Sequence, residues 1–316
     1  KKQPLSLAEH TSLIPSFSGH ETFPFRYIWL KKGVDAVRED STIFTSDRAT
    51  IILGVGKNMV RSIRHWCLAA NLIEEDKGVS NNRGQRLRPT RLGRAIFVDD
   101  GLDPYLEDAA TLWLLHWRIA TNPDRATTWF WAFSLFHRSE FTKERLQTEL
   151  LDGSKKAGWQ RISENSIKRD VDCFIRTYVP SRLTKTTVIE DTFDCPLVEL
   201  SLISELSDGK TYRFHRGPKP TLPHLLVAAT LAEFWETCFP NKEALAFSEI
   251  AHSPGSPGRV FQLDEDTLVT YLEGLENLTD RALAYDETAG LKQVYRREKL
   301  DSMELLGQYY ASCCPS

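Results

Sequence analysis

The hydrophobic positions near the start of the chain predict a group of short helices. From Lys57 onward, apolar residues recur three and four positions apart, which is the spacing of one buried helical stripe. Those residues are Met59, Val60, Ile63, Trp66, Cys67 and Ala70. Just before them, the polar run 45–47 carries an N-cap signal for a shorter apolar helix that continues to Leu53. A tight turn with two glycines, 54–56, joins the two predicted helices.

A β-hairpin is predicted directly after these helices. Residues 72–73 fit a short strand, and the Gly-, Asn- and Ser-rich segment 76–85 fits the tip of a hairpin. The chain returns through 86–89, and Thr90 is placed to cap a further helix. Helix, turn, helix, hairpin and closing helix in this order are typical of a winged helix-turn-helix domain, whose second helix enters the major groove of DNA.

Helical spacing also dominates the middle of the chain. Helices are predicted over 104–121, 127–137, 140–151 and 163–179, and short strands over 195–203 and 210–216. The first two of these helices are rich in aromatic residues, which could stack on exposed bases. Their helical spacing favours a core between helices, and His116 and His137 are expected to pack or cap there. The aromatic residues are Trp113, Trp117, Trp129, Trp131, Phe133 and Phe136.

The last hundred residues repeat the pattern of the first module. Helices are predicted over 222–239, 246–253 and 264–278, and alternation on both sides of 287–290 predicts a hairpin. We interpret this region as a second winged-helix-like unit. Its candidate recognition helix is acidic, so protein contact or structural packing is expected there instead of contact with phosphates.

Charge changes the picture because it is distributed unevenly. The 316 residues include 40 Lys or Arg and 43 Asp or Glu, a net charge of -3. Between Lys57 and Arg94, nine basic residues against three acidic ones leave +6, so the remainder carries -9. Such local asymmetry indicates an anionic partner better than the total does, although a solvated helix face is the alternative.

The basic residues fall where a winged helix would meet DNA. Arg and Lys on phosphates provide salt-dependent, largely non-specific affinity. Lys168 and Arg169, on a later predicted helix, are placed to extend this basic surface. The predicted nucleic-acid-binding residues are Lys57, Asn58, Arg61, Arg64, Arg83, Arg86, Arg88 and Arg91.

Composition excludes several other classes of protein. Hydrophobic residues make up 41% and charged residues 26%, near the globular average, which excludes disorder as a whole-chain state. No run approaches 18 apolar residues, so no membrane contact is expected. The six cysteines include no CxxC pair, so they lack the usual structural zinc signature and fit reduced thiols in a cytoplasm.

Four segments span roughly the whole chain: FSGHETFPFRYIWLKKG (17–33), LGVGKNMVRSIRHW (53–66), IKRDVDCFIRTYV (167–179) and FDCPLVEL (193–200). They resemble the domain-of-unknown-function 4007 family. Members of this family lie in bacterial DNA phosphorothioation loci. The resemblance implies an anti-phage defence protein that nicks double-stranded DNA and so exposes a strand for sulfur insertion. It also implies partners: a cysteine desulfurase, an ATPase and an ATP pyrophosphatase-type sulfur transferase.

One candidate catalytic cluster lies in the SGHETF segment. Cutting a phosphodiester generally uses metal-bound carboxylates, sometimes with a His or Lys base, and the chain has no PD-(D/E)xK or HNH string. His20 could activate water, and Glu21 could bind a divalent ion such as Mg²⁺ or Mn²⁺. The alternative is a helix N-terminal turn in which Ser18 or Thr22 caps and Glu21 completes a local hydrogen bond.

The other candidate catalytic cluster is acidic. Asp191 and Asp194 lie on a predicted loop, where ligands are easier to gather. Asp170 and Asp172 are two residues apart on a predicted helix and do not share a face, which weakens a shared metal site. Loop capping and surface solvation are the alternative for the loop pair. The catalytic candidates are therefore His20, Glu21, Asp191 and Asp194, and no metal ligands are assigned.

Together these patterns predict a mainly α protein. We expect a winged-helix DNA-binding domain over 1–100, a helical middle domain over 101–216 and a winged-helix-like domain over 217–316. The leading interpretation is a metal-dependent DNA nickase of a phosphorothioation system. The alternatives are a non-enzymatic DNA-binding subunit that recruits sulfur-transfer enzymes, and a transcriptional regulator of the locus.

Overall fold

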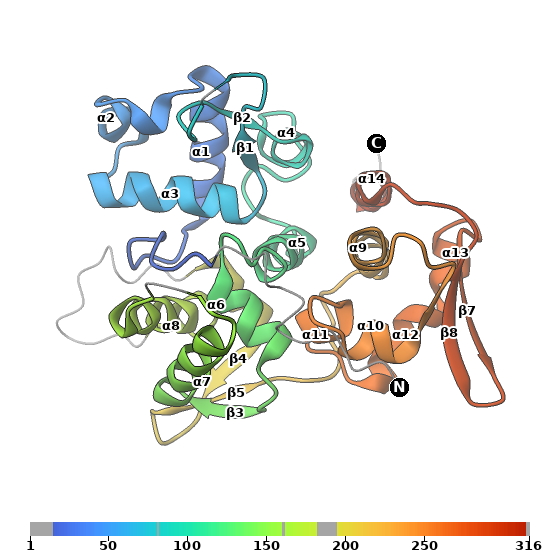
Figure 1. Cartoon of the computed structure of the whole chain (residues 1–316). Helices are drawn as coiled ribbons and strands as arrows, with labels where there is room; N and C mark the ends of the chain where they lie inside the picture. The colour runs from blue at the N-terminus through green and yellow to red at the C-terminus, as the bar shows by residue number, and fades with distance from the viewer. Residues whose placement is uncertain (1–14, 81, 160–161, 182–194, 314–316) are drawn as a thin grey trace.

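The computed structural model describes residues 15–80, 82–159, 162–181 and 195–313, and helices dominate it (Figure 1). The mainly α character expected from the sequence is therefore confirmed. The elements form three groups in chain order. We call residues 27–97 the first unit, residues 127–214 the second unit and residues 224–313 the third unit, and a helix over 109–120 lies between the first and the second. The predicted boundaries near residues 100 and 216 lie in loops between helices and strands of neighbouring units.

The first unit contains the predicted helices and hairpin. Val60, Ile63 and Trp66 are buried in a helix, as their spacing predicts, and Thr90 caps the last helix by accepting the Gly93 amide at 2.9 Å. Gly54 ends the shorter helix at a φ of 64°, where a side chain would be strained. The elements are α1 (Tyr27–Glu39), η2 (Ile43–Thr45), α2 (Ala49–Leu53), α3 (Lys57–Ala69), β1 (Ile73–Glu75), β2 (Leu87–Pro89) and α4 (Arg91–Phe97).

In the second unit, the structure differs from the predicted elements at two places. Residues 140–142 form a strand, because Thr142 caps the following helix at the Arg145 amide and so starts it later. Residues 196–200 form a 3-10 helix, since Pro196 fixes φ and lacks the amide that a strand would use. The elements are α5 (Ala109–Ala120), α6 (Thr127–Phe130), the π-helix η3 (Trp131–Leu135), β3 (Glu140–Thr142), α7 (Lys143–Lys156), α8 (Glu164–Tyr178), η5 (Pro196–Leu200), β4 (Ile203–Glu205) and β5 (Thr211–Phe214).

The third unit contains a projecting hairpin, formed by β7 and β8 (Figure 1). Ala289 and Gly290 have φ values of 52° and 79°, which suit the two-residue turn between its strands. The predicted helix over 264–278 is interrupted at Gly274. The elements are α9 (His224–Cys238), β6 (Ala244–Ala246), α10 (Phe247–His252), α11 (Pro257–Val260), α12 (Glu265–Glu273), α13 (Leu275–Leu278), β7 (Leu283–Thr288), β8 (Leu291–Arg296) and α14 (Ser302–Cys313), which packs on α9.

Two of the units repeat the same order of elements. In the second and third units a helix and a strand precede further helices and two antiparallel strands. Their sheets have the orders β3-β5-β4 and β6-β8-β7, so the last strand lies in the centre of each. The first unit has a two-stranded sheet, and its Ser41 carbonyl accepts the Leu87 amide at 2.8 Å beside β2. In the middle of the chain, β5 lies within the strand predicted over 210–216, and β3 is a strand that the sequence did not predict.

The predicted aromatic set forms a core. The six aromatic residues from Trp113 to Phe136 are buried, as the interpretation in terms of packing requires. His116 is fully buried, with Nδ1 2.8 Å from the Tyr178 hydroxyl and Nε2 2.8 Å from the Val260 carbonyl. It therefore joins α5, α8 and α11. None of the described helices is both long and apolar enough to cross a membrane.

Candidate nucleic-acid interface

The exposed side of α3 carries the predicted basic residues of its N-terminal half. Lys57, Asn58 and Arg61 are exposed, while the opposite side of the helix is buried against α1 and the core. Gly33 allows α1 to approach α3 closely, because a Cβ there would lie 2.4 Å from the Cys67 sulfur. The apolar side thus fixes the helix, and the polar side faces outward.

The hairpin tip lies next to α3. The Arg64 guanidinium donates to the Gly84 carbonyl at 3.1 Å, which ties the helix to the tip. Within the tip, the Asn82 side chain accepts the Arg86 amide at 2.6 Å and donates to the Asp76 and Arg86 carbonyls. Arg83 and Arg86 are exposed, and the described part of the chain offers them no carboxylate at ion-pair distance.

Two of the predicted DNA-binding residues are engaged elsewhere. Arg88 pairs across the hairpin with Glu74 at 2.9 Å, its register partner in β1. Arg91 pairs with Asp301 at 2.5 Å, just before α14, so it links the first unit to the end of the chain. The structure thus brings Lys57, Asn58, Arg61, Arg64, Arg83 and Arg86 together around α3 and the hairpin tip, and it directs Arg88 and Arg91 to other partners.

Residues 17–25, which we call the strap, run between α3 and α8 (Figure 1). On the α3 side, the Phe23 carbonyl accepts the Trp66 indole N–H at 2.8 Å and the Ser62 hydroxyl at 3.3 Å. Gly19 permits this close approach, because a Cβ there would lie 2.5 Å from the ring of His65. The strap therefore connects the first unit to the second.

The strap is anchored to α8 through His20 and Asp170. Asp170 is 1% exposed and accepts hydrogen bonds from the Ser18 amide at 2.5 Å and the Thr128 hydroxyl at 3.0 Å. His20 is also 1% exposed; its Nε2 lies 3.0 Å from Asp170 and its Nδ1 accepts the Thr22 amide at 3.0 Å. Described residues thus engage both ring nitrogens, and neither faces solvent.

The proposed catalytic residues are not brought together among the described residues. Glu21 lies on the outer side of the strap and pairs with Arg61 at 3.3 Å. Asp191 and Asp194 lie outside the described residues. The alternative of a turn at the start of a helix is correct only in part. Residues 18–22 form a turn in which the Glu21 amide donates to the Ser18 carbonyl at 3.2 Å, but α1 begins later, at Tyr27. The catalytic roles of His20, Glu21, Asp191 and Asp194 stay predictions.

Asp170 is the important residue whose role the sequence reasoning missed. It occupies a position in the apolar stripe of α8, between Ile167 and Phe174, and all three side chains are buried. A buried carboxylate requires hydrogen-bond donors around it. An acidic residue in the middle of a helical apolar stripe is therefore a signal for a buried polar anchor, which spacing alone can reveal.

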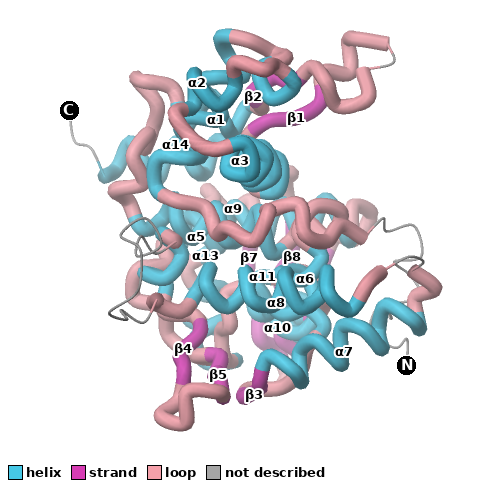
Figure 2. The backbone as a smooth tube through the Cα atoms, turned by 90° about the vertical axis from the view of Figure 1, so that its left-hand side faces the viewer, coloured by secondary structure: helices cyan, strands magenta, loops and turns pink. Residues whose placement is uncertain are grey.

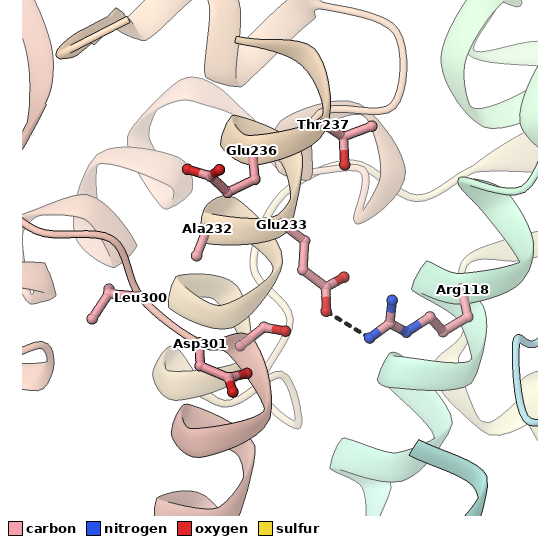
Figure 3. Close-up of a pocket in the computed structure, with 8 residues that line it drawn as sticks. Arg118, Ala232, Glu233, Glu236, Thr237, Leu300 and Asp301 are labelled. Carbon is pink, nitrogen blue, oxygen red and sulfur yellow. Dashed lines mark hydrogen bonds and ion pairs between the residues drawn. The ribbon is translucent and has the colours of Figure 1, made fainter. Parts of the chain in front are cut away.

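Potential metal ligands are scattered among the described residues. Within the parts of the chain that the structure describes, no three His, Cys, Asp or Glu side chains gather as potential ligands. A pocket of about 390 Å³ between α5, α9 and the start of α14 contains carboxylates, shown in Figure 3. There Glu233 pairs with Arg118 at 2.6 Å, Glu236 with Arg296 and Lys299, and Asp301 with Arg91. Cations already neutralise these carboxylates.

Comparisons with known proteins give a consistent picture. The family model described as "Protein of unknown function (DUF4007)" matches residues 17–310. Among solved structures, the chain is similar to one described as "SspB crystal structure", with a TM-score of 0.85 and 30% identity over 95% of this chain and 89% of that one.

A second similar structure is described as "Magnesium ion-bound SspB crystal structure". Its TM-score is 0.86 and its identity 29%, over 97% of this chain and 91% of that one. No protein with a curated description matches the chain. The family match covers nearly all of the described sequence. The chain therefore belongs to the DUF4007 family.

Proposed function

We propose that this protein binds duplex DNA through a winged helix in its first unit. In this proposal α3 is the recognition helix and the tip between β1 and β2 is the wing. The observation that carries the proposal is the surface formed by α3 and the tip, which the Arg64 to Gly84 hydrogen bond joins. Three exposed side chains lie on this surface and form no ion pair within 4.0 Å with a described carboxylate: Lys57, Arg83 and Arg86.

Binding of this kind would be largely electrostatic. Each Lys or Arg that neutralises a phosphate releases condensed counterions, so affinity falls as salt rises, with a slope of about 0.9 per neutralised phosphate. Asn58 is the polar residue placed among these cations, where a recognition helix contacts base edges. The acidic remainder of the molecule confines DNA to one side.

We propose further that the protein acts in a bacterial phosphorothioation defence system. The resemblance to the DUF4007 family implies that role, and the similarity to SspB along nearly the whole of both chains supports it. The partners would then be the cysteine desulfurase, the ATPase and the ATP pyrophosphatase-type sulfur transferase of such a system.

A more specific proposal is that the protein nicks the DNA that it binds. The magnesium-bound structure of SspB supports a divalent ion in that protein, which would stabilise charge on a phosphate under attack. The second candidate is a non-enzymatic DNA-binding subunit that recruits the sulfur-transfer enzymes. No catalytic step is assigned to particular residues.

The binding proposal is tested with the triple variant Lys57→Gln, Arg83→Gln and Arg86→Gln. Glutamine keeps most of the side-chain length and removes the charge. The affinity for a labelled duplex, measured by fluorescence anisotropy, should fall, and its salt slope should flatten by about three, one for each phosphate that is no longer neutralised. The matched control is Lys292→Gln, Arg297→Gln and Lys299→Gln in the third unit, which should bind like the wild type.

Nicking is tested by incubating supercoiled plasmid with the protein and Mg²⁺ or Mn²⁺, or with EDTA. A nickase would produce open-circle DNA only with metal, and the triple variant would lose this product in parallel with binding. That parallel loss excludes a contaminating nuclease. Plasmid that stays supercoiled with either metal, while the protein still binds it, would overturn nicking and leave the non-enzymatic subunit.

A further inference from the structure

Helix α8 occupies in the second unit the place that α3 occupies in the first. Each is the last long helix before two antiparallel strands. The exposed and half-exposed residues of α8 recur at helical spacing and so form one stripe along the surface. The stripe comprises Glu164, Asn165, Lys168, Arg169, Asp172 and Arg176. The opposite side of α8 is buried and includes the strap anchor Asp170.

The middle of this stripe carries two cations, Lys168 and Arg169, that form no ion pair with the residues that the structure describes. Asp172 pairs with Lys143 at 2.8 Å, which neutralises that part of the stripe. Lys168 and Arg169 are exposed, and no carboxylate in the described ranges lies within ion-pair distance of either. On a protein with a net charge of -3, adjacent cations left unpaired along an exposed stripe indicate an anionic partner.

The basic stripes of α3 and α8 meet at the strap. Arg61 of α3 pairs with Glu21, and Arg176 of α8 donates to the carbonyl of Thr22, the next residue of the strap. The two helices therefore flank the same short segment. Figure 2 shows the side of the molecule that lies on the left in Figure 1. There α3 is seen nearly end-on above α8, with a loop between them.

The strap also fixes how the two helices sit relative to each other. Its buried end is held by His20 and Asp170, and its outer end by Phe23 against Trp66. Lys168 lies two helical turns from Arg176, about 12 Å along the axis, which is the length of three to four base pairs of duplex. The distance between the two basic surfaces is thus short compared with a DNA site.

We propose that α8 is a second DNA-contacting helix, and that Lys168 and Arg169 bind phosphates of the same duplex that α3 and the hairpin tip contact. This inference rests on the proposed function of the first unit. It assigns the second unit a direct part in binding, in addition to its structural role. The strap then acts as a positioning segment that keeps both helices on one side of the duplex.

The test compares four full-length proteins for binding to one duplex of about 30 base pairs, longer than the few base pairs that α8 spans, over a series of salt concentrations. They are the wild type, the first-unit triple variant, Lys168→Ala with Arg169→Ala, and the control pair Lys292→Ala with Lys299→Ala in the third unit. Both pairs remove two positive charges from exposed or half-exposed side chains. Thermal unfolding of each protein, followed by circular dichroism, verifies that the fold is kept.

The α8 variant should lose about tenfold in affinity for each phosphate that it no longer neutralises at about 0.1 M salt, and its salt slope should flatten by about two. The control pair should match the wild type. If the first-unit variant loses affinity while the α8 variant matches the control in affinity and slope, the α8 proposal is overturned and the proposed function stands. If the wild type itself shows no salt-dependent binding, both fail.

Discussion

The first and third units start their candidate recognition helices in opposite ways. Helix α12 starts with Asp264 as its N-cap, which accepts the Thr267 amide at 2.9 Å, and its first turn contains Glu265 and Asp266. Helix α3 starts after Gly56, without a side-chain cap, and its first residue is Lys57. Acidic residues near a helix N-terminus stabilise it by about 0.3–1 kcal/mol, and basic residues oppose it.

This difference shows that α12 begins with residues that stabilise a helix N-terminus, whereas α3 begins with a residue that destabilises it. A cation at a helix N-terminus adds to the positive end of the helix dipole and to the unpaired amides there. Together these groups attract anions, which is how helix N-termini hold phosphates. Departures from local preferences are expected at functional sites. The comparison therefore favours α3 over α12 as the recognition helix in the proposed function.

The largest expected effect is a loss of stability when the strap, which lies between α3 and α8, is released from its anchor at Asp170. Replacing Asp170 with Ala leaves the Ser18 amide, the His20 ring and the Thr128 hydroxyl without their buried acceptor. The free energy of unfolding should fall by about 3–5 kcal/mol, as measured by urea titration. The control Asp172→Ala, which removes a half-exposed pair with Lys143, should change it by less than about 1 kcal/mol. Equal effects of the two variants would contradict the anchor.

The next effect concerns pH and tests the junction of the second and third units. Burial lowers the pKa of His116 to about 4, and burial with nearby cations lowers the pKa of His65 to about 3. Below a pH of about 6.5 the unfolded chain binds these protons and the folded chain does not. The free energy of unfolding should therefore fall as the pH decreases from about 6.5 towards 4, by up to about 1.4 kcal/mol per pH unit for each histidine.

The variant His116→Gln identifies how much of the pH dependence of the unfolding free energy comes from His116, which lies where the second and third units meet. Urea unfolding at a series of pH values from about 7 to about 5 should show a slope lower than that of the wild type by about the contribution of one histidine. The variant should also be less stable at neutral pH, because Tyr178 and Val260 lose a well-placed partner. An unchanged slope would mean that His116 takes up protons in the folded protein.

A smaller effect tests the comparison between α3 and α12 directly. Lys57→Glu should stabilise the protein by about 0.3–1 kcal/mol, since it suits the helix dipole, while weakening duplex binding. Glu265→Lys in α12 should destabilise by a similar amount and leave duplex binding unchanged. Thermal unfolding and fluorescence anisotropy measure the two quantities. Stability and binding that change in the same direction for Lys57→Glu would contradict the functional interpretation of α3.

The smallest effect separates predicted from actual members of the basic surface. Arg91→Ala removes an exposed ion pair with Asp301, which should change the free energy of unfolding by about 0–1 kcal/mol. Because Arg91 faces the end of the chain, duplex binding should stay within about twofold of the wild type, a change of about 0.4 kcal/mol. Arg86→Ala is the matched comparison and should weaken binding. Equal losses for both variants would mean that the surface extends to α4.

Local features could be predicted from the sequence because their signals are local. The apolar stripe of α3, the Thr90 cap and the hairpin at 287–290 all depend on residues within a few positions of each other. Spacing and turn residues are sufficient for these. The basic window from Lys57 to Arg94 is visible for the same reason.

Long-range partners could not be predicted. His20 meets Asp170 across 150 positions, and Arg91 meets Asp301 across 210. Sequence spacing indicates that a side chain is polar and exposed, but it does not say which opposite charge lies beside it. These long-range partners determine which of the predicted basic residues remain free to contact DNA in the proposed function. They also explain why His20 is buried against Asp170 and does not face solvent.

Amide hydrogen exchange with and without a saturating duplex tests the central claim most directly, because it reports on every unit of the unmodified protein at once. We predict slower exchange in α3 and the hairpin tip, over 57–64 and 77–86, and unchanged exchange in α12, over 265–273. Slower exchange in α12 with unchanged exchange in α3 would contradict the account.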